Sequence, residues 1–368
     1  MNWHRIHRLG LVVGIITLLA SACGGSTTTT DNWGTATSAA GNGGMDALIA
    51  AAKQEGTLNL IAIPRNWANY GAIIDGFKAK YGLKIDSANP DGSSQEEVTA
   101  VQNLAGTNKA PDVLDVGMAI ALANTTLFAP YQVEKWNDIL PAQKEPTGLW
   151  FQDYGGFMAV GYDSSKVPTI TSINDLLGPA FRSRVALNDD PTKANAALNG
   201  VMMANLAVGG TLDDISKGVA FFHQMNQKGN FVPVKATTST VKSGQTPVVF
   251  DWDYLNADHG KDVPAWKVFV PSNAILGGYY AQAINKQAPH PAAARLWEEY
   301  LYSDEGQNLW LKGLARPVRM AAMQKSGKID ATAAAALPPV SGTPVFLSAD
   351  QATKASAYLA ANWAQAIK

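Results

Sequence analysis

Two pairs of aspartates are the residues of this chain best suited to bind a charged ligand. Asp189 and Asp190 lie between the end of a short apolar segment and a predicted helix, and Asp251 and Asp253 share one face of a strand predicted over Val248–Asn256. No lysine or arginine lies beside the second pair, and unpaired carboxylates avoid full burial but suit a wet cleft. The four acids, combined with aromatic rings, predict a pocket for an organic cation, with a solvated surface as the alternative.

Aromatic residues near the start of the folded chain would supply the apolar part of this pocket. The apolar run over 56–63 has the pattern of a buried strand in a parallel sheet, and the loop after it contains Asn66, Trp67 and Tyr70. In open α/β sheets, ligands bind in the crevice outside the carboxyl ends of the strands. We therefore expect this loop to form one lip of the binding site. The alternative is that Trp67 and Tyr70 begin the apolar face of the next helix.

A smaller set of residues would suit an anionic ligand instead. Ser94 lies at the start of a helix predicted to run to Leu104, where free backbone amides can meet an anionic or hydroxyl group, although an ordinary helix cap explains the same residues. Arg65, Lys193 and Arg316 would bind a carboxylate or a phosphate if they faced the same cleft. The sequence does not orient these three side chains, so both signs of ligand charge stay open at this point.

The chain contains no recognisable catalytic or metal-binding motif. The GxSxG, HExxH and P-loop patterns are absent, and the SxxK spacing of Ser239 and Lys242 lacks its companion motifs. His223, His259 and His290 are scattered, and no two of them are spaced to share a helix face. We therefore expect a protein without enzymatic activity, with no catalytic residue, cofactor or metal site.

The N-terminal segment has the features of an export signal. Residues 1–22 combine a positive start, a short apolar run and small residues, which predicts a secretory signal peptide. The residues before Cys23 resemble a bacterial lipobox, so this cysteine, which is the only one in the chain, is expected to be lipidated. Residues 23–44 are rich in glycine, serine and threonine and are predicted to form a flexible tether. We expect an exported protein, lipid-anchored at the outer face of the cell membrane or in the periplasm.

The rest of the chain is long enough for two lobes. Its predicted strands and helices indicate an α/β fold, with the chain crossing between lobes at 150–162 and again at 269–284. Lobe 1 would then comprise 45–157 and 278–368, and lobe 2 would comprise 158–277.

The net charge of the mature chain is small. The signal segment has two arginines and no acid, so its removal leaves 27 basic and 30 acidic residues and a net charge of −3. No basic field suggests nucleic acid as a partner.

The segment 289–319 resembles the late helix pair and returning loop of extracellular solute-binding proteins of bacterial ABC importers, in the branch with spermidine/putrescine, ferric-iron, thiamine and phosphonate binders. The resemblance covers essentially the whole mature chain. It implies a two-lobed, periplasmic-binding-protein-like fold of type II, in which each lobe is a mixed sheet flanked by helices and two crossover strands form the hinge. Asn66, Trp67 and Tyr70 resemble a motif whose aromatic residues line the ligand in polyamine binders, and Asp190 matches an acid that meets an ammonium group there.

Other positions depart from the polyamine pattern. Lys193 stands where those relatives have a further acid, and Gly278 and Tyr280 stand where they tend to have a tryptophan and an aspartate. Ferric binders use an adjacent tyrosine pair in the segment that here contains only Tyr254. Tyr279 and Tyr280 are such a pair, but they lie later, at the second crossing.

The resemblance implies a solute-binding component that captures a small polar solute between two lobes and delivers it to a membrane permease. A polyamine-like organic cation is the expected ligand, ferric iron or an organophosphonate or carboxylate is the alternative, and a secreted lipid-anchored hydrolase is a remote one. The expected partners are the small-molecule ligand, the ABC permease subunits and, through the lipid anchor, the membrane, and the protein is expected to be a monomer. The candidate ligand-binding residues are Asn66, Trp67, Tyr70, Ser94, Asp189, Asp190, Asp251, Asp253, Tyr279 and Tyr280.

Overall fold

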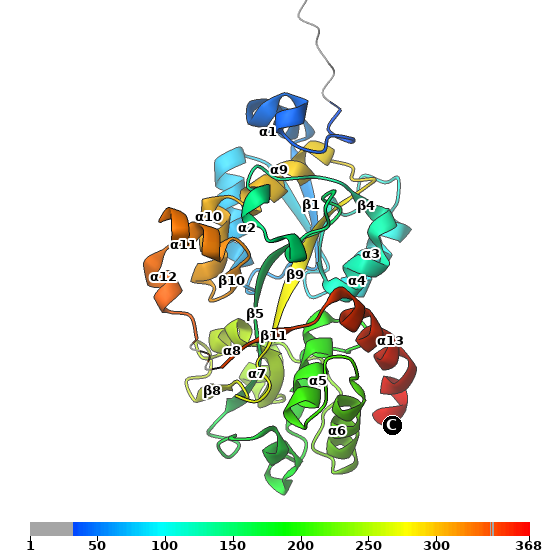
Figure 1. The fold of residues 1–368 in the computed structure, drawn as a ribbon, viewed down its shortest axis with the longest axis vertical. Helices are drawn as coiled ribbons and strands as arrows, with labels where there is room; N and C mark the ends of the chain where they lie inside the picture. The colour runs from blue at the N-terminus through cyan, green and yellow to red at the C-terminus, as the bar shows by residue number, and fades with distance from the viewer. Residues whose placement is uncertain (1–31, 339, 341) are drawn as a thin grey trace, which may run out of the picture. The chain divides into compact units, whose positions relative to one another are not determined.

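The computed structural model describes residues 32–338, 340 and 342–368, which form a two-lobed α/β unit (Figure 1). The predicted signal peptide and Cys23 lie outside the described residues. The described helices include none that is long and apolar enough to cross a membrane.

The chain begins in the lobe drawn at the top of Figure 1 and reaches the other lobe along a long strand, β5. The elements up to this crossing are α1 (Gly44–Glu55), β1 (Thr57–Ile61), α2 (Tyr70–Tyr81), β2 (Lys84–Ala88), α3 (Ser94–Asn103), β3 (Val113–Gly117), α4 (Met118–Ala123), β4 (Phe128–Ala129) and β5 (Phe151–Asp163). The lower lobe then adds β6 (Val185–Leu187), α5 (Asn195–Ala207), α6 (Ser216–Gln227), α7 (Thr238–Ser243), β7 (Val248–Trp252), α8 (Asp253–His259) and β8 (Trp266–Phe269).

A second long strand, β9, returns the chain toward the first lobe (Figure 1). The elements from here to the C-terminus are β9 (Leu276–Asn285), α9 (Pro291–Leu301), α10 (Asp304–Lys312), β10 (Arg316–Pro317), α11 (Met320–Ser326), α12 (Ala331–Ala335), β11 (Val345–Phe346) and α13 (Ala349–Ala366). The last helix packs on α4 and also on α5 and α6. The division of the chain into lobes at 157/158 and 277/278 remains a prediction.

The crossing strands β5 and β9 organise the sheets of both lobes. They pair with each other antiparallel, as Gly156 opposite Gly278 illustrates, and each also pairs with shorter strands. In the first lobe β3 and β4 pair with β9 and β10 pairs with β5, whereas in the second lobe β7 and β8 pair with β5 and β6 lies parallel to β7. The expected mixed α/β fold with two crossover strands is confirmed.

The first parallel pair, β1 and β2, forms where the apolar run predicted it. Four of the five residues of β1 are buried, and the strand is followed by α2, whose buried face includes Ile73 and Phe77. Ser93 and Glu96 form the predicted capping box, in which each side chain bonds the backbone of the other residue, and α3 starts directly after Ser93. These local signals fix where the loops after β1 and β2 turn toward the second lobe.

The strand predicted over 248–256 is wrong beyond Trp252. The chain turns there into α8, because the Asp253 carboxylate accepts hydrogen bonds from the backbone N–H groups of Tyr254 and of Phe157 on β5, both at 3.0 Å. An acid in the first turn suits the positive end of a helix. Asp251 and Asp253 therefore do not lie on a common strand face as expected.

The tether predicted over 23–44 is wrong for its described part. Trp33 is buried, and Arg295 of α9 donates hydrogen bonds to the carbonyl oxygens of Gly34 and Ala36. Composition missed this, because one tryptophan and a buried guanidinium anchor a segment that is otherwise small and polar.

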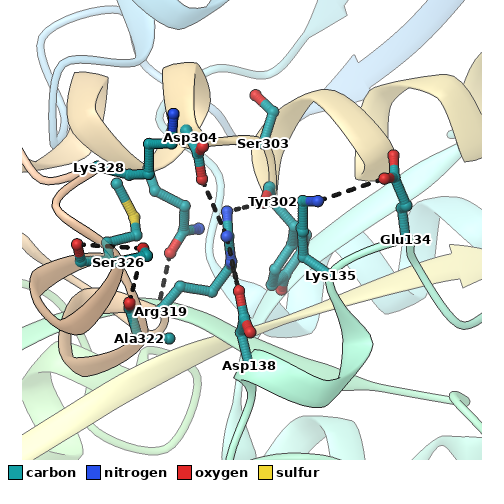
Figure 2. A network of polar contacts seen from close by, with 12 residues as sticks. Glu134, Lys135, Asp138, Tyr302, Ser303, Asp304, Arg319, Ala322, Ser326 and Lys328 are labelled. Carbon is teal, nitrogen blue, oxygen red and sulfur yellow. Dashed lines mark hydrogen bonds and ion pairs between the residues drawn. The ribbon is translucent and has the colours of Figure 1, made fainter.

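The returning loop after α10 is fixed by a buried arginine, as Figure 2 shows. Arg319 has its guanidinium Nη2 2.7 Å from Asp138 and 2.9 Å from Asp304, and its Nη1 donates to the carbonyl oxygen of Tyr302. Each bond is charge-assisted and the arginine is 3% exposed, so the network locks the loop onto the first turn of α10. This arginine ends the segment 289–319 that carries the sequence resemblance.

Candidate functional site

A cavity of about 930 Å³, part of it open to solvent, lies where the loops after β1 and β2 meet the second lobe. The residues that line it come from both lobes. Its polar and aromatic lining residues include Asn66, Trp67, Ser94, Glu97, Asp115, Tyr154, Asn188, Asp189, Lys235, Thr238, Asp251, Asp258, His259 and Tyr280.

Six of the ten residues expected to bind ligand line this cavity: Asn66, Trp67, Ser94, Asp189, Asp251 and Tyr280. They come from the β1 exit loop, the α3 N-terminus, the loop after β6, β7 and β9. The structure therefore brings together segments more than 200 residues apart in the chain, in the crevice where open α/β sheets bind ligands.

The structure places the other four expected residues outside the cavity lining. Tyr70 is fully buried behind it, and Asp190 accepts hydrogen bonds from the backbone and hydroxyl of Thr192 within its own turn. Asp253 pairs with Arg316 at 2.8 Å. Tyr279 points to the other face of β9 from Tyr280 and packs near Phe346, as the alternation of strand side chains requires.

Asp115 is the central cavity residue that the sequence interpretation missed. It lies on β3 and is 7% exposed, and its Oδ2 accepts hydrogen bonds from the hydroxyls of Tyr70 at 2.8 Å and Tyr154 at 3.2 Å. An acid within the apolar strand ending at Gly117 was the available signal. Tyr70, expected to contact ligand, instead orients this carboxylate.

Glu97 lies next to Asp115 in the cavity wall. Its carboxylate accepts the backbone N–H of Asp115 at 2.9 Å, and the side chain is 1% exposed. Burial and the nearby Asp115 charge raise the pKa of Glu97 well above its usual value. Burial likewise raises the pKa of Asp115 to about 7. Burial therefore disfavours the charged form of both carboxyls, and a positive charge beside them would counter this effect.

Asp251 provides a second buried carboxylate from the other lobe. Its Oδ2 accepts the side-chain amide of Asn188 at 2.8 Å, and its Oδ1 accepts the backbone N–H of Trp252 at 2.8 Å. Burial raises the pKa of Asp251 to about 7, and the hydrogen bond from Asn188 only partly offsets this. The predicted acid is therefore in the cavity, but buried and hydrogen-bonded.

Among the described residues, Lys235 is the only lysine or arginine that lines this cavity. Its Nζ lies 2.8 Å from Asp189 and also donates to the backbone carbonyl of Asp91 across the cleft. The Asn66 side-chain amide makes a similar contact, donating to the Thr238 hydroxyl at 2.8 Å. These two contacts join loops of the first lobe to the second lobe at the opening of the cavity.

The three basic residues that would have indicated an anionic ligand do not line this cavity. Arg65 pairs with Asp75 at 2.6 Å, Lys193 lies 3.7 Å from Asp190, and Arg316 pairs with Asp253. His259 does line the cavity, but burial lowers its pKa and favours the neutral ring. The lining thus combines six carboxylates with one paired lysine. The carboxylates are Asp91, Glu97, Asp115, Asp189, Asp251 and Asp258.

Three aromatic rings line the same cavity as the two buried acids. The Trp67 indole N–H donates to the Tyr154 hydroxyl at 2.7 Å, and its ring lies edge-on to Tyr280 with centroids 6.0 Å apart. Tyr154 and Tyr280 stack with centroids 5.7 Å apart. Such faces favour methylene groups and cations. Within the described residues, no group of three histidine, cysteine or acidic side chains is placed to hold a metal ion.

Residues 108–336, more than half of the chain, match the family model of the bacterial extracellular solute-binding proteins. The chain belongs to this family. The expectation drawn from the segment 289–319 is thereby confirmed: this is a solute-binding protein of the ABC-importer type. Family membership implies a small-molecule ligand, a permease partner and export to the periplasm or cell surface, and it is a transport family rather than an enzyme family.

Proteins similar to this solute-binding protein differ in the ligands they are named for or were solved with. Iron uptake protein A2 of Synechocystis sp. is 22% identical over 282 residues, which cover 72% of this chain and 78% of that protein. Iron-bound HitA from Pseudomonas aeruginosa superposes with a TM-score of 0.63 at 19% identity, covering 84% of this chain and 99% of its own. AfuA from Actinobacillus pleuropneumoniae, with fructose-6-phosphate bound, gives 0.64 at 15% identity, with 85% and 98% covered. At these identities the solved structures share the fold, and the ligand must be argued from the cavity.

Proposed function

We propose that this solute-binding protein captures an organic cation with amino groups, such as a polyamine, between its two lobes and delivers it to its permease. The observation that carries the proposal is the acidic composition of the cavity lining, where six carboxyl groups face one lysine that already pairs with Asp189. Carboxylates recognise ammonium groups through charge-assisted hydrogen bonds, and a buried site strengthens that attraction.

The arrangement along the cavity supports a ligand with an apolar middle. Asp115 lies in the first lobe and Asp251 in the second, and the rings of Trp67, Tyr154 and Tyr280 line the same cavity. The Tyr154 hydroxyl donates a hydrogen bond to Asp115. Methylene groups would pack on these rings while charged ends meet the acids. Binding across both lobes would favour their closure, the transition expected of such proteins.

Ferric iron is the alternative that the named relatives raise. The adjacent Tyr279 and Tyr280 do not support it here, because only Tyr280 lines the cavity. Burial raises the pKa of Tyr280 above its ordinary value, which disfavours the tyrosinate that a ferric ligand would require. The side chain points instead toward Trp252, whose indole N–H lies 3.3 Å from the Tyr280 hydroxyl.

A thermal-unfolding panel on the purified protein tests the proposed function. It compares putrescine, spermidine, thiamine, Fe³⁺ with citrate, and aminoethylphosphonate. A ligand present at about a thousand times its dissociation constant adds roughly 4 kcal/mol of stability, which raises the unfolding temperature by several degrees. We expect this shift with the polyamines. A shift with iron or phosphonate alone would overturn the proposal.

A further inference from the structure

One carboxylate oxygen in the cavity has no hydrogen-bond partner. Asp115 Oδ1 is buried and unpaired, although Oδ2 of the same group accepts two tyrosine hydroxyls. Leaving a buried acceptor unsatisfied costs free energy, and an ionised one costs more. Asp115 is one of the residues that line the cavity, so a donor bound there would lie near this carboxyl group.

The groups around Asp115 can accept hydrogen bonds but have few donors to spare. Glu97 adds a second buried carboxylate, and no described lysine or arginine lies within ion-pair distance of either acid. The Tyr70 and Tyr154 hydroxyls already donate to Asp115, and the Trp67 indole N–H already donates to Tyr154. A molecule that satisfies this end of the cavity must therefore bring both positive charge and N–H or O–H groups.

We infer that Asp115 and Glu97 form a subsite for a primary ammonium group at the first-lobe end of the cavity. This inference rests on the proposed function and adds to it the kind of cation. A primary ammonium has three N–H donors, which suit the unpaired Asp115 oxygen and the Glu97 carboxylate beside it. A quaternary ammonium has none and leaves that oxygen unsatisfied. The methylene next to the ammonium would lie against Tyr154 and Trp67.

Titration calorimetry with matched cations tests the inference. Putrescine, agmatine and spermidine have primary ammonium ends, whereas tetramethylammonium is an organic cation with a quaternary nitrogen and no N–H or O–H donor. We expect binding of at least one primary amine and none of tetramethylammonium. Asp115→Asn, which keeps the shape of the side chain, should weaken the amine by roughly thirtyfold or more, because it removes one partner of a buried charge pair. Glu97→Gln should weaken it in the same direction.

The control variant is Asp112→Asn. Asp112 is another buried aspartate, just before β3, whose carboxylate accepts the His290 and Asn59 backbone N–H groups away from the cavity. This variant should keep the wild-type affinity. Melting temperatures of all variants report folding separately, and Asp115→Asn should melt no lower than wild type at pH 8, because it removes an unsatisfied buried charge.

The outcomes separate the inference from the proposed function. If a primary amine binds Asp115→Asn as tightly as wild type, the subsite is wrong while the proposed function stands. If no primary amine binds the wild-type protein, whether or not tetramethylammonium, iron or phosphonate binds, both are wrong. Loss of amine affinity in Asp115→Asn, with affinity retained in Asp112→Asn, supports the subsite.

Discussion

At the residue scale, the cavity acids differ from surface acids in how they couple folding to pH. Asp115 and Asp251 have folded-state pKa values raised to about 7 by burial, whereas an unfolded aspartate titrates near 3.9. A carboxyl with a raised folded pKa holds its proton more tightly in the folded state. Its stabilising contribution is present below the unfolded pKa and is lost as the pH rises from about 4 through about 7.

We therefore predict that Asp115→Asn and Asp251→Asn each gain stability relative to wild type as the pH rises from 4 to 7. The gain should exceed about 1 kcal/mol, because each pKa unit corresponds to about 1.4 kcal/mol. Urea unfolding of the ligand-free proteins at several pH values measures it. Burial also raises the pKa values of the neighbouring carboxyls Glu97, Asp153 and Glu298, which act in the same direction. Burial raises the pKa values of Tyr70 and Tyr154 as well, but these hydroxyls stay protonated from pH 4 to 7. A stability difference that stays constant across this range would contradict the prediction.

Residue types alone located part of the cavity. Trp67 and Asp251 were predictable because each ends a strand or begins its exit loop, where α/β folds bind ligands. Asp115 was not predictable, because a single acid in a buried strand has no ligand-binding signature in the sequence. Its role becomes visible only through the hydrogen bonds that it accepts from Tyr70 and Tyr154. Asp190 was favoured by resemblance, but its carboxylate is used by the turn that contains Thr192. Local hydrogen bonding of this kind competes with ligand contact and has no sequence signature beyond the residue pair.

At the element scale, short apolar strands and capped helices were predictable, and the transition from β7 to α8 was not. The alternation through Tyr254 continues a strand pattern, yet the chain turns at Asp253 because a carboxylate buried beside β5 captures two backbone N–H groups. One of these contacts comes from Phe157 on β5, which lies 96 residues earlier in the chain. Periodicity describes one segment and therefore cannot report it.

The C-terminal helix α13 packs on helices of both lobes and can therefore stabilise them together. It packs on α4 and on α6, and its Trp363 lies edge-on to Phe222 and Phe231 with centroids 5.5 and 6.1 Å away. Trp363→Ala should lower the free energy of unfolding by about 3 kcal/mol, because it leaves a large cavity among buried rings. Urea denaturation measures this.

The matched control on the same helix is Tyr358→Ala. Tyr358 is 36% exposed, so its loss should change stability by less than about 0.5 kcal/mol. If Trp363→Ala unfolded like wild type, α13 would not belong to the cooperative unit of the protein, and its packing on both lobes would carry no energetic weight.

At the scale of the whole molecule, β5 and β9 connect the lobes and other contacts hold them in register. The pairs Asn66 with Thr238 and Lys235 with Asp91 join the lobes at the cavity mouth. They are partly exposed, so each is worth little by itself and can break when a ligand enters. A buried contact beside β5 is better suited to fix the hinge.

That contact is the ion pair of Arg316 on β10 with Asp253 at the start of α8. Arg316 Nη1 lies 2.8 Å from Asp253 Oδ2, its guanidinium covers the Phe157 ring at 4.4 Å, and Asp253 is fully buried. Burial raises the pKa of Asp253 even though the Arg316 charge lowers it. The pair therefore clamps the central part of β5 between an element of each lobe.

Arg316→Met should cost about 3 kcal/mol or more of unfolding free energy, because it leaves the Asp253 charge buried and uncompensated. Arg316→Met combined with Asp253→Asn should recover much of that loss, since the second change removes the stranded charge. Urea unfolding of the two single variants and the double variant gives the coupling energy of the pair. A double variant as unstable as the sum of the singles would mean that the two residues act separately. The clamp on β5 would then come from the Phe157 backbone bond to Asp253 alone.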